Sequence, residues 1–87
     1  MQWRTTMQET LKLIILTNHL YLLGKVTELD EEPNFLIEDC YKVESEEELS
    51  KYPLYTEQRY LFLTSDVVLS IVDPSPKVAD LHSKTTG

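Results

Sequence analysis

Two short polar segments contain the side chains that could recognise a ligand. The first carries Asp30 and Asn34, a few residues after Gly24, and the second is the turn at residues 64–66. An amide such as Asn34 offers both hydrogen-bond donors and an acceptor, so it can pair with the edge of an unstacked base. A neighbouring carboxylate can fix the direction in which that amide points. These residue types indicate non-covalent recognition of a ligand.

Residues that could support catalysis or bind a metal are present without the spacing that such sites require. Cys40 is the one cysteine, and neither His19 nor His82 is placed to activate it or to share a metal with it. The acidic runs at 30–32 and 46–48 lack the alternating pattern of a calcium loop. With two glycines, the chain has no glycine-rich phosphate loop. We therefore expect no catalytic residue, no metal and no cofactor, and predict that the protein is not an enzyme.

The negative charge of the chain is unevenly distributed. The formal net charge is −7, and residues 28–57 contain eleven acidic residues against two lysines. Lysine and arginine bind phosphates, so this balance argues against a broad grip on a nucleic-acid backbone. The acidic residues either form a solvated rim, or meet a basic partner protein, or surround a site where only unpaired bases are read.

Length and composition indicate a single intracellular domain. An 87-residue chain has room for one core, and its hydrophobic fraction of 41% is typical of a folded protein. One cysteine cannot form a disulfide within the chain, which suits a reducing, cytoplasmic setting. The sequence shows neither a signal peptide nor an apolar run long enough to span a membrane. Oligomerisation would help to stabilise so small a core.

Apolar alternation and turn residues predict a mainly β chain. The spacing of Thr6 and Glu9 is that of a capping box and predicts a short helix over residues 7–11. Gly24 lies inside the second predicted strand, where a glycine allows a sharp bend. Residues 1–72 form the predicted domain, and residues 73–87 form a polar, mobile tail. Five strands are expected, over residues 13–17, 20–29, 34–43, 56–64 and 67–72, with a variable loop at 44–55.

The order of these elements suits a small, strongly bent antiparallel barrel of the SH3-like or OB type. The stretch from Gly24 through Asp30 and Asn34 resembles the first sequence motif of the Sm and Sm-like (LSm, Hfq) proteins. The turn at Ser65-Asp66 matches part of the second motif, and the resemblance covers roughly residues 13–72. It implies a short N-terminal helix followed by a five-stranded, strongly bent antiparallel Sm-like (SH3-type) barrel. A different small barrel and another α+β domain are the alternatives.

The resemblance also implies a function in RNA or nucleic-acid processing. Sm-like proteins form rings that bind RNA at a central pore, and the ligand here would be single-stranded RNA or DNA. In the family, the asparagine contacts a uracil edge and the aspartate supports it, which assigns these roles to Asn34 and Asp30. Glu32 stands where the family has a stacking aromatic or histidine, and Thr64 and Ser65 stand where it has an arginine and a glycine. The implied nucleic-acid-binding residues are Asp30, Glu32, Asn34, Thr64, Ser65 and Asp66.

The apolar runs at 60–63 and 67–72 indicate how copies of the chain would assemble. In Sm rings the fourth strand of one subunit pairs with the fifth strand of the next, which corresponds here to residues 56–64 and 67–72. Unpaired apolar edges would otherwise aggregate, and a repeated head-to-tail contact closes into a ring. The first hypothesis is a homo-oligomeric ring that binds nucleic acid. The alternative is an acidic, ring-shaped protein-interaction scaffold for a basic protein.

Overall fold

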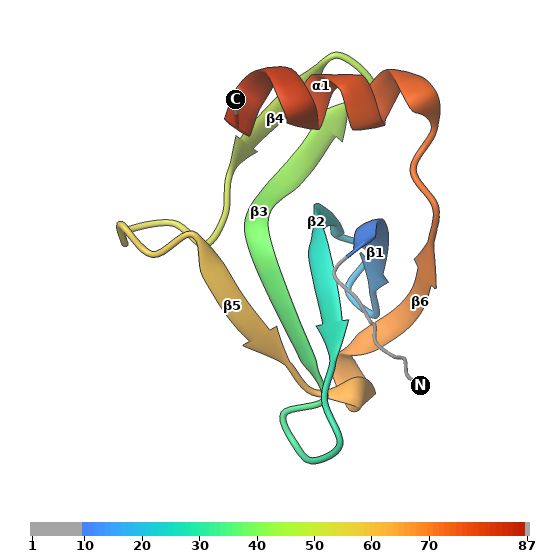
Figure 1. Ribbon diagram of the computed structural model, residues 1–87, viewed down its shortest axis with the longest axis vertical. Helices are drawn as coiled ribbons and strands as arrows, with labels where there is room; N and C mark the ends of the chain where they lie inside the picture. The colour runs from blue at the N-terminus through green and yellow to red at the C-terminus, as the bar shows by residue number, and fades with distance from the viewer. Residues whose placement is uncertain (1–9, 87) are drawn as a thin grey trace, which may run out of the picture.

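The computed structural model of the protein describes residues 10–86, and within them it contains six strands and one α-helix. All the strand pairs are antiparallel, in the order β4-β3-β2-β1-β6, and β5 pairs with the first half of β3 (Figure 1). A short 3₁₀ turn, Ser65–Val67, joins β5 to β6. The elements are β1 (Thr10–Leu16), β2 (Tyr21–Glu28), β3 (Phe35–Ser45), β4 (Glu48–Lys51), β5 (Tyr60–Leu63), β6 (Val68–Val72) and α1 (Pro76–Thr86).

The sheet is open, so the prediction of a five-stranded Sm-like barrel is wrong. β5 is paired with β3 and β6 with β1, and no ladder in the described part of the chain joins β5 to β6. The two strands lie on opposite sides of the sheet in Figure 1. The predicted variable loop at 44–55 also contains a sixth strand, β4. Because β5 and β6 do not pair with each other in the described residues, the sheet ends in separate edges instead of closing.

Within residues 10–86, the one α-helix lies at the C-terminal end, after the last strand. The helix predicted over residues 7–11 falls mostly outside the described residues, and its last two positions begin β1. The polar tail predicted from residue 73 onward instead contains α1, which buries Val78 and His82 on one face. Pro76 is the first helical residue, a position where the missing N–H of proline costs no hydrogen bond. No helix within residues 10–86 has the length and apolar character needed to cross a membrane.

The inner face of the sheet encloses the main core. Successive side chains of a strand point to opposite faces, so the core residues of β1 and of β2 are an even number of positions apart. Partly buried side chains of β6, Val68 and Ile71, pack against its margin. The buried members are Ile14, Leu16, Leu22, Val26, Ile37, Cys40 and Leu63.

A bulge in β3 bends the sheet opposite Gly24. The register between β2 and β3 shifts between Leu23 and Lys25, so Asp39 and Cys40 together face Gly24. Asp39 adopts a left-handed backbone conformation, with φ of 52°. A bulge of this kind adds one residue to one strand and increases its bend and twist. The bend allows β3 to pair with β5 on one side of the bulge and with β4 on the other.

Position 24 requires glycine because the two strands approach closely there. A Cβ at this position would lie 2.6 Å from Cγ2 of Ile37 and 2.9 Å from the backbone oxygen of Glu38. The sequence prediction that Gly24 permits a sharp bend agrees with this geometry. The extra residue, however, is on β3 and not on the strand that carries the glycine.

α1 covers the outer face of the sheet beside the bulge. Leu23 and Tyr41 are cross-strand partners on that face, and Leu23 is fully buried. The Tyr41 ring meets the His82 ring edge to face, with 5.7 Å between the ring centroids. Nε2 of His82 donates a hydrogen bond to the backbone oxygen of Asp39 at 2.8 Å. Since a bulge leaves its extra residue unpaired in the ladder, the helix supplies the partner that this carbonyl needs.

Replacing Gly24 with alanine should lower the free energy of unfolding by about 1–3 kcal/mol, the usual cost of overpacking a filled site. The added methyl group has to displace Ile37 and the β3 backbone. Urea denaturation followed by circular dichroism measures the loss. Ser70→Ala, at an exposed position of β6, is the control and should change stability by less than about 0.5 kcal/mol. Equal stability of Gly24→Ala and the wild type would contradict the close approach.

Replacing His82 with alanine should destabilise the protein by about 2 kcal/mol or more, because it leaves the Asp39 carbonyl without a partner and removes buried packing. Hydrogen exchange should also show weaker protection of the amides of α1. Asp80→Ala, on the exposed face of the same helix, is the matched control. If both variants were as stable as the wild type, α1 would not be docked through His82.

Candidate functional site

Two connections meet at one end of the sheet and bring together most of the residues predicted to bind nucleic acid. Phe35 pairs with Leu63, so Asn34 and Thr64, which adjoin these partners, lie next to each other across β3 and β5. The N–H of Leu29 donates to the backbone oxygen of Asn34 at 2.6 Å and closes the first connection, residues 29–34. Figure 1 shows this loop projecting beside the 3₁₀ turn. We call residues 29–34 and 64–66 the loop pair.

The side-chain amide of Asn34 links the two halves of the loop pair. With its nitrogen turned toward Glu32, the amide donates to Oε2 and Oε1 of that residue at 2.7 and 3.0 Å, and to Oγ of Ser65 at 3.1 Å. In the reverse orientation, Oδ1 accepts from the N–H of Ser65 at 3.3 Å but faces the Glu32 carboxylate. An ionised carboxylate can only accept hydrogen bonds, so it favours the first orientation.

Glu32, and not Asp30, is the carboxylate that orients the amide. The family resemblance assigns this role to Asp30, yet among the described residues Asp30 makes no hydrogen bond to Asn34 and lines a neighbouring pocket instead. Glu32 also accepts a long hydrogen bond from Oγ of Ser65, at 3.5 Å. From the sequence, Glu32 was predicted to bind nucleic acid at the position of the family's stacking ring, and a role in orienting the amide was not predicted. Its role depends on how the loop turns, which the spacing of residues does not reveal.

The 3₁₀ turn is held by side chains of the loop pair itself. Oγ1 of Thr64 donates a hydrogen bond to Oδ1 of Asp66. The N–H of Val67 donates to the backbone oxygen of Thr64 at 3.3 Å. Asp66 lies in the first turn of the 3₁₀ segment, and all three predicted residues, 64–66, are exposed. The turn therefore presents polar groups whose positions are fixed within the chain.

The electrostatic character of the loop pair is strongly acidic. Residues 28–37 contain four carboxylates and residues 60–72 contain Asp66, whereas neither stretch contains a lysine or an arginine. The groups offered to a ligand are therefore mainly acceptors, together with the Asn34 amide. Such groups suit ligands that present N–H donors, and they give a phosphate no cationic partner.

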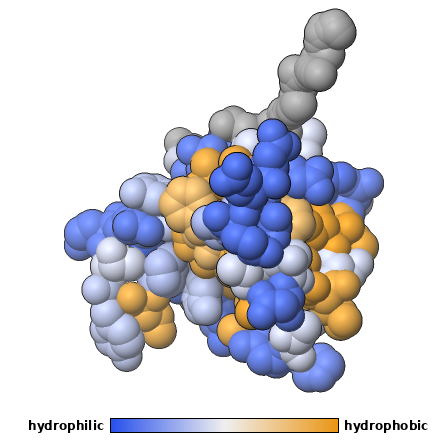
Figure 2. Space-filling model, turned by 90° about the horizontal axis from the view of Figure 1, so that it is seen from below, coloured by the Kyte–Doolittle hydropathy of each residue, from blue (hydrophilic) through white to orange (hydrophobic). Residues whose placement is uncertain are grey.

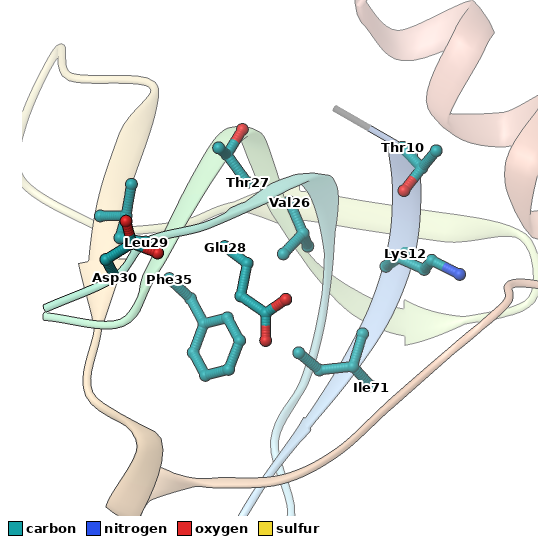
Figure 3. Close-up of a pocket in the computed structure, with 9 residues that line it drawn as sticks. All are labelled: Thr10, Lys12, Val26, Thr27, Glu28, Leu29, Asp30, Phe35 and Ile71. Carbon is teal, nitrogen blue, oxygen red and sulfur yellow. The ribbon is translucent and has the colours of Figure 1, made fainter. Parts of the chain in front are cut away.

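A pocket of about 950 Å³ adjoins the loop pair, and it was not predicted from the sequence (Figure 3). Figure 3 shows the Glu28 carboxylate pointing into it between Phe35 and Ile71. Nζ of Lys12, another lining residue, forms an ion pair with Oδ1 of Asp73 at 2.6 Å. The lining therefore combines apolar side chains with the charged side chains of Lys12, Glu28 and Asp30. Its lining residues are Thr10, Lys12, Val26, Thr27, Glu28, Leu29, Asp30, Phe35 and Ile71.

Cys40 lies in the core, within the bulge of β3 and outside the loop pair. Its side chain is fully buried, and this burial raises the pKa of the thiol to about 12, with a smaller opposing effect from the Arg59 charge. A thiol with this pKa stays protonated at neutral pH and is a poor nucleophile. Within residues 10–86, no group of three or more His, Cys, Asp and Glu side chains is arranged to hold a metal ion.

Comparison with known proteins assigns the sequence to a protein family but identifies no curated relative. Residues 9–87 match a family model that is described as a family of unknown function. No curated protein matches the chain. The ligand therefore has to be inferred from the geometry of the loop pair.

Replacing Asn34 with aspartate should destabilise the protein at pH 7, by about 1–3 kcal/mol, and much less at pH 4. The introduced carboxyl would face Glu32 at hydrogen-bond distance, so its folded-state pKa should lie above its unfolded value. A raised pKa means that stability is present at low pH and is lost as the pH rises. Urea denaturation at both pH values measures this change.

The matched control is Asn34→Ala, which removes the amide without adding a charge. Its loss of stability should be nearly the same at pH 4 and pH 7. If the loss in Asn34→Asp were equally independent of pH, the contact between Asn34 and Glu32 would not exist in solution.

Proposed function

We propose a function for this chain from the geometry of its loop pair. The chain belongs to DUF6561, a family of unknown function. The protein is a self-assembling, non-enzymatic binding module that takes up single-stranded nucleic acid, RNA or DNA, through base edges. It works in a reducing, cytoplasmic setting, as its one cysteine suggests. The observation that carries the proposal is the Asn34 amide, held between Glu32 and Ser65 at 2.7 and 3.1 Å.

An amide held in one orientation is well suited to recognise a base. Its remaining hydrogen-bonding positions have fixed directions, so little side-chain freedom is lost when a ligand binds. The carboxylates around it accept hydrogen bonds, as glutamate and aspartate do from the amino group of cytosine. Adenine, cytosine and guanine carry exocyclic amino groups, whereas uracil does not. We therefore infer a preference for these amino-bearing bases over uracil, which differs from the uracil preference implied by the Sm resemblance.

The contribution of the phosphate backbone to binding is small in this proposal. Neither half of the loop pair contains a lysine or an arginine, the residues that neutralise phosphates. A single site of this kind binds weakly. Several linked sites bind a longer strand more tightly, because the second and later contacts become intramolecular. Self-assembly of the chain would provide these linked sites.

The open edges of the sheet support self-assembly. In the described part of the chain β5 is paired only with β3 and β6 only with β1, and the exposed fractions of Phe62 and Leu69 on these strands are 50% and 61%. Exposed apolar edge strands tend to pair with another chain. Figure 2 shows a hydrophobic patch on the side where β6 runs in Figure 1. Pairing of β5 with β6 of the next copy is a head-to-tail contact that can repeat around a ring.

A second candidate function is an acidic scaffold that binds a basic protein. The observation that favours it is the run Asp30-Glu31-Glu32 at the tip of the loop pair, with no cation in either half. Such a surface attracts a basic partner at long range, and this attraction weakens as salt is added. The dependence of binding on salt therefore separates the two candidates.

Fluorescence anisotropy with labelled homopolymers of adenine, cytosine and uracil tests the proposal. Adenine or cytosine oligomers should bind more tightly than uracil oligomers. Affinity should change little with salt, because the loop pair has no cation to neutralise phosphates. Each neutralised phosphate would contribute about −0.7 to the slope of the logarithm of the binding constant against the logarithm of the salt concentration. Asn34→Ala should weaken binding about tenfold, the effect of losing one or two hydrogen bonds. Ser83→Ala, on the exposed side of α1, should leave affinity unchanged.

Two results would reject nucleic-acid binding at the loop pair. One is the absence of binding to every oligomer at low salt, and the other is binding that Asn34→Ala does not affect. Binding of a polylysine peptide that fades with salt, together with no binding of oligomers, would instead favour the acidic scaffold.

A further inference from the structure

We propose that the loop between β4 and β5 docks into the pocket of a second copy of this chain. The inference rests on the proposed self-assembly and identifies the side chains that make the contact. At the tip of the loop, Leu54 and Tyr55 are 59% and 100% exposed. Figure 1 shows the loop projecting from the sheet beyond β4 and β5. Large apolar side chains that are exposed next to each other are typical of a surface that binds a partner.

The tip of this loop is held in shape by Arg59. Nη2 of Arg59 donates to the backbone oxygen of Thr56 at 3.2 Å and to that of Pro53 at 3.5 Å, so it joins the two sides of the tip. Tyr55 between them has a φ of 65°, a left-handed conformation that a bulky side chain rarely adopts. A strained residue persists only when its surroundings hold it there. The backbone of the tip is thus held by Arg59, and the side chains of Leu54 and Tyr55 project from it into solvent.

The pocket next to the loop pair has the chemistry that this tip requires. Its walls include Val26, Phe35 and Ile71, and its volume of about 950 Å³ exceeds the space that one tyrosine and one leucine side chain occupy. Figure 3 shows the Glu28 carboxylate inside the pocket, where it can accept a hydrogen bond from a phenolic hydroxyl. A tyrosine has an apolar ring and a polar tip, so it matches both features of the pocket.

The tip and the pocket lie beside the two strand edges that self-assembly would join. The tip precedes β5, from which residues 56–59 separate it, and the pocket includes Ile71 of β6. When β5 pairs antiparallel with β6 of another copy, residues before Tyr60 face the C-terminal end of that β6. The same contact therefore pairs the strands and brings the tip toward the pocket. Because tip and pocket are different surfaces, each copy can use both, and the contact repeats from head to tail.

Cysteine pairing between two populations of the protein tests this contact. One population carries Glu57→Cys, at an exposed position beside the tip that leaves Leu54 and Tyr55 in place, and the other carries Thr27→Cys, at a residue that lines the pocket. After mild oxidation of the mixture, the mixed dimer should exceed either homodimer several-fold on a non-reducing gel. The native Cys40 is fully buried and is common to all samples. Ser83→Cys replaces Glu57→Cys in the control mixture, and a mixed-dimer yield no higher than in this control would overturn the inference.

Self-association constants from sedimentation equilibrium provide the second test. Leu54→Ser combined with Tyr55→Ser should weaken association at least tenfold, and Tyr55→Phe should weaken it several-fold, the effect of one hydrogen bond. Glu57→Gln, at an exposed position of the same loop, is the matched control and should associate as the wild type does. Circular dichroism confirms that each variant is folded.

The edge variant Leu69→Lys separates this inference from the proposal on which it rests. If Leu69→Lys weakens association while the Leu54 and Tyr55 variant does not, the tip contact is overturned and edge-to-edge assembly stands. If the wild type is a monomer at every concentration, both are overturned. Weakened association in both variants supports the contact. Binding of nucleic acid to the loop pair is measured separately and does not depend on these results.

Discussion

At Gly24 the backbone of β2 lies so close to β3 that a methyl group would meet Cγ2 of Ile37 at 2.6 Å, and the extra residue of β3 lies opposite this point. The bend that follows lets one long strand pair with β5 before the bulge and with β4 after it. The bulge also frees the Asp39 carbonyl, and His82 binds it from the buried face of α1. A single close contact between two backbones thus accounts for the split edge of the sheet and for the docking of the C-terminal helix.

The same strand pairing produces the candidate site. Because Phe35 is paired with Leu63, the chain leaves β3 and β5 at neighbouring positions, and Asn34 meets Ser65 there. Strand geometry therefore brings the two connections together, while Glu32 fixes the direction of the amide. Charge then limits the ligand, since a surface with carboxylates and no cation suits base edges or a basic protein better than phosphates. The open edges of β5 and β6 would add further copies of the site through assembly.

Alternating apolar residues predicted the approximate positions of five strands, because strands that face a core have a period of two. β4 could not be recognised in this way, since the segment Glu48–Lys51 has one strongly apolar residue and is short. α1 is also polar in composition, and its burial depends on Leu23 and Tyr41 on the outer face of the sheet. Whether a sheet closes depends on the lengths and directions of its edge strands, which the Sm resemblance did not determine. In the candidate site, the resemblance to the two Sm motifs predicted that Asn34 lies near the 64–66 turn. The contact of the Asn34 amide with Glu32 and the presence of the pocket depend on loop conformation.

The register of β2 against β3 is open to direct measurement by nuclear magnetic resonance. Nuclear Overhauser contacts between the backbone protons of the two strands identify which residues are opposite each other. We predict that Leu23 lies opposite Tyr41 and that Lys25 lies opposite Glu38, a shift of one residue at Gly24. A continuous register that places Lys25 opposite Asp39 would contradict the bulge, and with it the arrangement of edges and loops on which the proposed function depends.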